Sequence, residues 1–170
     1  RSFVGLLGDK NLIFFSLMAV ILQLAAYTGA FGFVPNILRD LGASNFLLGL
    51  ATTLATLPGA VSSWLSGVWI SRTIGIRRAL MVGFVMVAAT LYGTVMTTSI
   101  GVILLLLVVY GFARGFMLPL LTSAAVREVP NAMQSTAASF FQSVYGIGMT
   151  LGPILSGFLA DRWGMPARFY

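Results

Sequence analysis

The chain has 170 residues, of which 58% are hydrophobic and only 8% charged, and its formal net charge is +6. Soluble domains carry about 25% charged residues, so this composition excludes an ordinary water-soluble fold. The basic residues are divided among several short segments and form no patch or stripe, which argues against a nucleic-acid-binding surface.

Catalytic and metal-binding residue types are scarce. The chain has no Cys and no His, so a thiolate nucleophile, an imidazole base or a common zinc site cannot be built from it. Its four carboxylates lie far apart, near the ends of apolar segments, and form no visible acid and base pair. We therefore expect no enzyme, metal or cofactor. The carboxylates are Asp9, Asp40, Glu128 and Asp161.

Long apolar runs separate the charged clusters, and each exceeds the roughly 20 residues that span a bilayer core. The runs do not alternate in polarity, so they predict helices. The expected fold class is all-α: a polytopic membrane helix bundle with five complete transmembrane helices and the start of a sixth near Arg168. The five are predicted at residues 11–35, 46–70, 78–97, 100–125 and 133–159.

The first predicted helix contains Gln23, Tyr27 and Thr28, with Gln23 and Tyr27 one turn apart on the same face. The fifth contains Gln142 and Tyr145, which are also neighbours on one face. Polar side chains are costly against lipid, so these residues either line a cavity or form hydrogen bonds between helices. Both readings stay open at this point.

A short pattern follows both the second and the fifth predicted helix. Residues 66–72 read Ser-Gly-Val-Trp-Ile-Ser-Arg and residues 156–162 read Ser-Gly-Phe-Leu-Ala-Asp-Arg, ninety positions apart. Three predicted helices lie between the copies, so the copies end on opposite sides of the membrane. This arrangement predicts inverted three-helix repeats, which are typical of transporters.

Basic residues in the loops predict the orientation of the chain. Six of them share the side of the N-terminus and three lie on the other side, so we expect the N-terminus to be cytoplasmic, in the cell membrane. The six are Arg1, Lys10, Arg72, Arg77, Arg78 and Arg127, and the three are Arg39, Arg162 and Arg168.

Arg114 interrupts the fourth predicted helix. A charge at the centre of a membrane helix costs about 2.5 to 3.5 kcal/mol, so the side chain is expected to face a cavity or the bundle interior. It would contact an anion or the solute, or pair with a carboxylate outside this chain. The alternative is an arginine that extends toward the interface or is capped structurally.

The loop motif resembles one from a known family. Residues 67–78, Gly-Val-Trp-Ile-Ser-Arg-Thr-Ile-Gly-Ile-Arg-Arg, are similar to the loop between the second and third helices in a major facilitator superfamily half. Ser71 replaces the usual aspartate, and one extra residue separates Arg72 from Gly75. The resemblance implies a cytoplasmic gate, whereas the same arginines also satisfy the orientation rule alone. The gate residues would be Gly67, Arg72, Gly75, Arg77 and Arg78.

The fifth predicted helix contains Gly148-Met-Thr-Leu-Gly152-Pro153-Ile-Leu-Ser-Gly157, which resembles the fifth-helix motif of the drug and proton antiporters of that family. Ser156 replaces one glycine of the motif. Gly148 and Gly152 lie one turn apart and would let a neighbouring helix approach closely. Pro153 removes a helical hydrogen bond and would kink the helix.

The resemblance covers the whole chain and implies one six-helix half of a twelve-helix carrier, with the C-terminal half favoured. The implied function is secondary active transport of a small solute by alternating access, as efflux or proton-coupled antiport. A non-transporting membrane sensor or scaffold of the same fold is the alternative. The expected partners are the bilayer, a small solute, protons and the other half. The candidate cavity residues are Gln23, Tyr27, Arg114, Gln142 and Tyr145.

Overall fold

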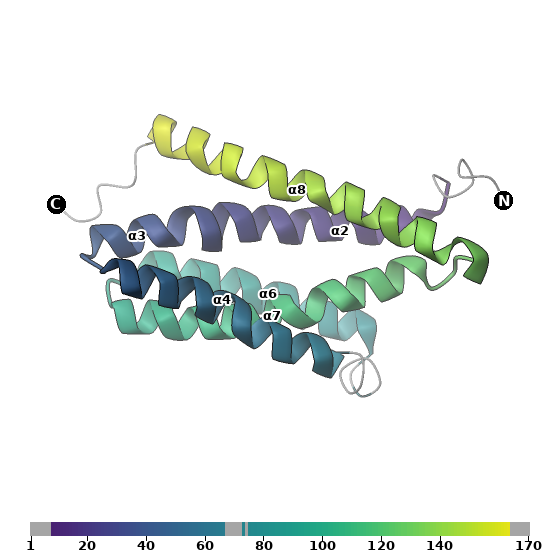
Figure 1. Ribbon diagram of the computed structural model, residues 1–170, viewed down its shortest axis with the longest axis horizontal. Helices are drawn as coiled ribbons and strands as arrows, with labels where there is room; N and C mark the ends of the chain where they lie inside the picture. Colours follow the sequence, from purple (N-terminus) through teal and green to yellow (C-terminus); the bar gives the residue numbers. More distant parts are fainter. Residues whose placement is uncertain (1–7, 67–72, 74, 164–170) are drawn as a thin grey trace.

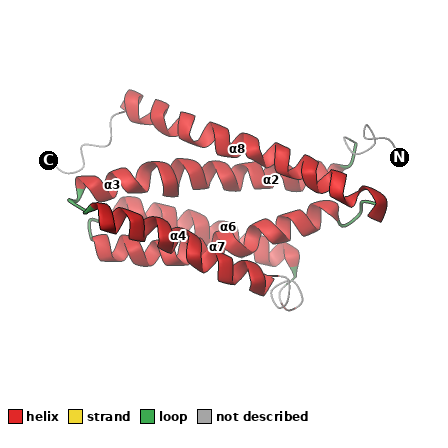
Figure 2. Cartoon of the chain, viewed as in Figure 1, coloured by secondary structure: helices red, strands yellow, loops and turns green. Residues whose placement is uncertain are grey.

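Every element in the described part of the chain is helical (Figure 2), and no strand occurs there. The computed structural model describes residues 8–66, 73 and 75–163, with side chains up to residue 158. The all-α prediction is confirmed. The elements are α2 (Lys10–Ala25), the π-helix η1 (Ala26–Phe33), α3 (Val34–Asp40), α4 (Asn45–Leu65), α6 (Ile76–Met96), α7 (Ile100–Val126), the 3₁₀ turn η3 (Asn131–Met133) and α8 (Gln134–Trp163).

The long helices run side by side as a bundle (Figure 1). Helices α2, η1 and α3 follow one another in a single continuous rod beside α8, while α4, α6 and α7 form the other side. Helix α7 is central, because it contacts α2, α4, α6 and α8. The other long helices therefore surround α7, and Arg114 lies in the middle of this helix.

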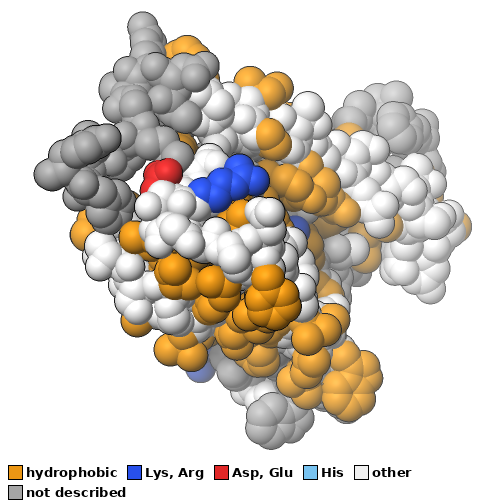
Figure 3. All heavy atoms as spheres, turned by 60° about the vertical axis from the view of Figure 1, so that its left-hand side comes forward, with side chains coloured by type: hydrophobic (Ala, Val, Ile, Leu, Met, Phe, Trp, Pro, Cys, Tyr) orange, Lys and Arg blue, Asp and Glu red, His pale blue; other side chains and the backbone are white. Residues whose placement is uncertain are grey.

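Four stretches are long and apolar enough to cross a membrane: Lys10–Asp40, Asn45–Leu65, Ile76–Met96 and Ile100–Val126. Large apolar side chains such as Phe14, Trp64 and Leu105 are exposed on the outside of the bundle. Figure 3 shows hydrophobic side chains covering much of one face. Lipid solvates such a surface, whereas water does not. The number of spans stays a prediction, since α8 matches the fifth predicted helix but is not one of these four.

The observed helices follow the predicted segments, with three main differences at their ends. The first helix was predicted to end at Pro35 but continues to Asp40, and α8 extends to Trp163, four residues past the predicted end. The second helix was predicted to reach residue 70, whereas α4 ends at Leu65 and residues 67–70 lie outside the described part.

The first helix passes Pro35 because the preceding eight residues are wound as a π-helix. A proline lacks an N–H group, and its ring collides with the carbonyl four residues earlier in an α-helix. Here the N–H of Val34 bonds the carbonyl of Gly29, five residues back, which widens the turn before the ring. The side-chain amide of Asn36 donates to the Gly32 carbonyl at 3.2 Å. Side-chain bonds of this kind let membrane helices tolerate proline.

Two caps explain where the first helices begin. The carboxylate of Asp9 accepts the backbone N–H groups of Asn11 and Leu12 at 3.0 and 3.1 Å, and so starts α2. The hydroxyl of Ser44 accepts from the N–H of Leu47 at the start of α4. The residues that connect α3 to α4 include Gly42, whose φ of +79° favours glycine.

Candidate functional site

Small residues bring α4 and α7 into close contact. A Cβ atom built on Gly111 would lie 2.8 Å from the Ala55 carbonyl oxygen, and one on Gly115 would collide with the backbone of Gly59. The two helices therefore touch backbone to backbone. The sequence alone does not reveal which helices pair here, although Ala51, Ala55 and Gly59 show the four-residue spacing of small residues that is typical of such contacts.

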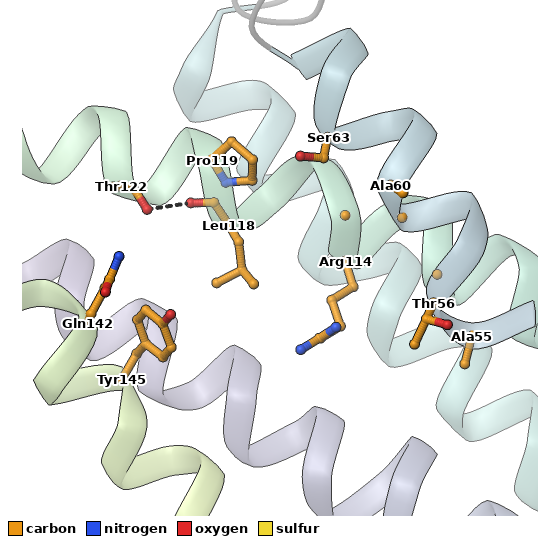
Figure 4. A pocket seen from close by; sticks show the side chains of 13 residues that line it. Ala55, Thr56, Ala60, Ser63, Arg114, Leu118, Pro119, Thr122, Gln142 and Tyr145 are labelled. Atoms are coloured by element: carbon orange, nitrogen blue, oxygen red, sulfur yellow. Dashed lines mark hydrogen bonds between the residues drawn. The ribbon is translucent and has the colours of Figure 1, made fainter. Parts of the chain in front are cut away.

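A pocket of about 430 Å³ opens between α4, α7 and α8 (Figure 4). The small residues of α4 and α7 form one wall, and Gln142 and Tyr145 of α8 approach from the opposite side. Arg114 projects from α7 into this region. The lining residues are Ala55, Thr56, Gly59, Ala60, Ser63, Gly111, Arg114, Gly115, Leu118, Pro119, Thr122, Gln142 and Tyr145.

Arg114 is held by the first helix. Its Nη2 donates to the side-chain oxygen of Gln23 at 2.9 Å, and its guanidinium carbon lies 5.9 Å from the centre of the Phe31 ring. Gln23 is fully buried. Arg114 itself is half-buried; the amide oxygen partly compensates its charge, and the aromatic ring adds a cation–π contact.

Three buried polar atoms, two of them in Arg114 and Gln23 themselves, have no hydrogen-bond partner among the described residues. They are the side-chain nitrogen of Gln23, Nε of Arg114 and the hydroxyl of Tyr110. Tyr110 is 1% exposed and lies one turn before Arg114 on α7. The sequence does not mark Tyr110 as a site residue, because an isolated tyrosine in an apolar run does not indicate which groups surround it.

The structure brings together three of the five candidate cavity residues, since Arg114, Gln142 and Tyr145 line the pocket. Gln23 does not line the pocket but accepts a hydrogen bond from Arg114. Tyr27 is not a lining residue: its ring packs on Phe31, with centroids 5.5 Å apart, and its Cβ faces α8. Their roles in binding stay predictions.

The Gly-Pro motif packs α8 against the first helix. A Cβ on Gly148 would lie 2.5 Å from the Val20 carbonyl oxygen, and one on Gly152 would lie 2.5 Å from the Cβ of Tyr27. The hydroxyl of Thr28 also donates to the Gly152 carbonyl at 3.1 Å. The two glycines therefore lie where α8 and the first helix approach each other closely, which is compatible with the packing role that their spacing predicts.

The two remaining small residues of the motif differ from each other. Ser156 is buried, and its Cβ would lie 3.0 Å from a Cβ built on Gly32 of η1. The serine that replaces the expected glycine is thus matched by a glycine on the facing helix. Gly157 is exposed and has nothing near its missing Cβ, and Pro153 is also exposed.

The predicted gate loop is only partly described. Gly67 and Arg72 lie outside the described residues. Gly75 precedes α6 with a φ of +80°, and Arg77 and Arg78 are exposed in the first turn of that helix. Their positions are compatible with both the gate and the orientation readings.

The hydroxyl groups on α4 are used within the helix. Thr52, Thr53 and Thr56 each donate to a carbonyl three or four residues earlier. Among the described residues, no three His, Cys, Asp or Glu side chains gather where a metal ion could bind.

Apolar helices, close glycine contacts and a polar pocket around a membrane-embedded arginine together define a polytopic integral membrane protein. The family model described as Major Facilitator Superfamily matches residues 15–170. The chain belongs to this family of membrane transporters, and it is therefore grouped with transporters rather than with enzymes.

Three curated relatives illustrate the similarity. The chain is 24% identical to the multidrug export protein EmrB of Escherichia coli K12 over 149 residues, which cover 86% of this chain and 29% of EmrB. It is 27% identical to the uncharacterized MFS-type transporter YuxJ of Bacillus subtilis over 95 residues, or 55% of this chain and 24% of YuxJ. It is 27% identical to the proton-coupled antiporter flippase LtaA of Staphylococcus haemolyticus over 89 residues, or 52% of this chain and 22% of LtaA.

The matched regions thus span about a quarter of the length of these relatives. No solved structure matches the chain significantly.

Proposed function

We propose that this chain is part of a secondary transporter that moves a small solute across the cell membrane by alternating access. The observation that carries the proposal is the pocket between α4, α7 and α8, which is lined by Arg114 from the middle of the long apolar helix α7. Ionisable groups at this depth are costly and usually mark a solute or ion pathway. Membership of the Major Facilitator Superfamily supports the same function.

Efflux, with protons moving in exchange, is the proposed direction and coupling. The support comes from the antiporter-type Gly-Pro motif on α8, and from relatives whose names describe multidrug export and proton-coupled antiport. The close contacts of Gly148 and Gly152 would let α8 and the first helix move as one unit during the transport cycle.

The proposed unit of function is larger than this chain. We propose that residues 1–170 form one half of a twelve-helix carrier, the C-terminal half being favoured, with inverted three-helix repeats inside it. The other half would cover the open side of the pocket. The N-terminal end of the first helix and the loop before α6 would face the cytoplasm, where Arg72, Arg77 and Arg78 would form part of a gate.

Transport by the full-length protein tests the proposal. Membrane vesicles carrying the full-length protein are loaded with ethidium or carboxyfluorescein, and a pH gradient is imposed in either direction. We expect gradient-dependent movement of at least one dye, and its loss in Arg114→Ala at near-normal membrane expression. A sensor or scaffold would move neither dye in either gradient, and unchanged transport by Arg114→Ala would contradict the role of the pocket.

A further inference from the structure

The open hydrogen-bonding capacity around Arg114 consists mainly of donors. The Arg114 guanidinium has a free Nε–H, the Gln23 side chain has a free NH₂ group, and the Tyr110 hydroxyl is also without a partner. The Gln23 oxygen, which is the acceptor among these groups, is already used by Arg114 Nη2. Gln23 and Tyr110 are 0% and 1% exposed, so bulk water does not compensate them in this arrangement.

The positive charge at this point has no described counter-charge. Arg114 is the fifteenth of the 27 residues of α7, so it lies roughly 20 Å from either end of the helix at 1.5 Å per residue. That distance is beyond the reach of an arginine side chain. The carboxylates of this chain lie at the ends of helices: Asp9 caps α2, Asp40 ends α3, Glu128 follows α7 and Asp161 is in the last turns of α8.

We propose that Arg114, oriented by Gln23, binds a carboxylate group, and that the transporter therefore selects acidic solutes. A carboxylate supplies negative charge and several acceptor lone pairs, which match the guanidinium of Arg114 on the pocket wall, while the buried Gln23 holds that guanidinium in place. A cationic or purely apolar solute would leave the donors unpaired and the charge uncompensated. This inference rests on the proposed transport function and adds the class of solute.

Two hydroxyl groups on the pocket wall, one on each side of Arg114 in Figure 4, differ from it in polarity. The hydroxyls of Thr56 and Thr122 donate their protons to backbone carbonyls of their own helices, so they present oxygen lone pairs to the pocket. These groups do not compete for a carboxylate. An acidic solute is therefore expected to place its carboxylate at Arg114 rather than at these two hydroxyls.

A carboxylate at Arg114 has two possible sources: the solute, or an Asp or Glu side chain from the remainder of the transporter. The chemistry at Arg114 is the same in both cases. If the carboxylate belongs to the solute, the site is free to bind an added carboxylate. If it belongs to the protein, the site is already occupied, and removing Arg114 leaves a protein carboxylate buried without a partner, which is strongly destabilising.

The experiment uses the purified full-length protein in lipid nanodiscs. Equilibrium dialysis measures binding of benzoate, with benzamide as the uncharged probe of the same shape, and the midpoint of thermal unfolding is recorded without a probe. The variants are Arg114→Gln, Gln23→Glu and, as a matched control, Arg127→Gln. Arg127 follows the last residue of α7 and is exposed.

For a solute carboxylate we expect benzoate but not benzamide to bind. Arg114→Gln should weaken benzoate binding about ten- to hundredfold, because charge-assisted hydrogen bonds are lost. The unfolding midpoint should not fall, because the substitution removes a charge from the interior of the bundle. Gln23→Glu should abolish binding while keeping the midpoint, because its new carboxylate occupies the guanidinium. A purely structural role of Gln23 would not give this pattern. Arg127→Gln should change neither quantity.

For a carboxylate from the protein itself, benzoate would not bind and Arg114→Gln would lower the unfolding midpoint. That result would support a carboxylate at Arg114 but would overturn the selection of acidic solutes. The proposal is overturned if benzoate does not bind and Arg114→Gln leaves the midpoint unchanged, or if benzamide binds as well as benzoate. Dye transport without a carboxylate effect would reject only this inference. Benzoate binding without any gradient-driven transport would reject the proposed function and leave the binding site in place.

Discussion

At the residue scale, the side chains that matter most are those whose surroundings depart from simple apolar packing. Arg114 is a cation in a helix of Leu, Val, Phe and Gly residues, and its hydrogen-bond partner is the buried Gln23. Gly115 matters because it has no side chain. Any side chain there would collide with the backbone of Gly59, which cannot move as the end of a flexible side chain can.

Gly115→Ala is therefore expected to destabilise the protein by roughly 1 to 3 kcal/mol, as overpacking of a well-packed interior does. The measurement is the midpoint of thermal unfolding of the full-length protein in mild detergent.

Gly49→Ala is the matched control, since Gly49 is also inside a helix but has nothing within 4 Å of its missing Cβ. The control should be neutral or gain up to about 1 kcal/mol from the better helix propensity of alanine. Equal midpoints for the two variants would show that α4 and α7 are not in backbone contact.

At the element scale, the π-helical turns of η1 determine how the first helix meets α8. Pro35 prevents regular α-helical bonding just after this segment, and the wider turns place Thr28 and Gly32 toward α8. Such π segments often occur at functional sites. Phe31 of the same segment contacts Arg114. The π-helix η1 therefore contacts both the Gly-Pro motif of α8 and the charged site.

Gly32 and Ser156 test this contact directly. A Cβ on Gly32 would lie 3.0 Å from the Cβ of Ser156, close to the spacing of about 3.5 to 4.5 Å found in disulfides. We expect Gly32→Cys with Ser156→Cys, in a cysteine-free full-length background, to form a disulfide on mild oxidation. The measurement is the loss of maleimide labelling, restored by reductant.

The control pair is Gly32→Cys with Gly157→Cys, because Gly157 is the next residue but has nothing near its missing Cβ. Labelling of the control pair should persist after oxidation. Equal protection of both pairs would indicate that η1 and α8 do not hold the register described here.

At the scale of the whole molecule, the up-and-down order of the helices agrees with the distribution of basic residues. The start of α2, the end of α4 and the end of α7 lie at one end of the bundle, on the right in Figure 1. The same end therefore carries Lys10, Arg77, Arg78 and Arg127, each at or beside the end of a helix. Cytoplasmic loops are enriched in such residues, which favours a cytoplasmic location for this end.

Labelling from outside the cell tests that orientation. Thr98 lies between α6 and α7, and Asn131 follows α7 at the opposite end of the bundle; both are exposed. With a membrane-impermeant maleimide, Thr98→Cys should react in intact cells, whereas Asn131→Cys should react only after the membrane is permeabilised. The reverse result would place the N-terminal end of the first helix outside.

The sequence by itself determined the membrane class, the positions of the helices to within a few residues, the close-packing motif on α8 and the unusual position of Arg114. These features are local: they depend on the apolar length of a segment and on residue types within one helix. Hydropathy reports that length directly, and a glycine spacing or a buried charge is visible without knowledge of any neighbour.

Only the tertiary structure decided which residues meet. Gln23 and Arg114 are 91 positions apart, and Thr28 and Gly152 are 124 positions apart. Each pairing depends on how the helices are rotated about their axes, and the rotation is set by the summed packing of all neighbours. The continuation of the first helix past Pro35 was also visible only in the structure. The bonds that compensate the proline come from a local change to π-helical winding, which no residue pattern in the segment predicts.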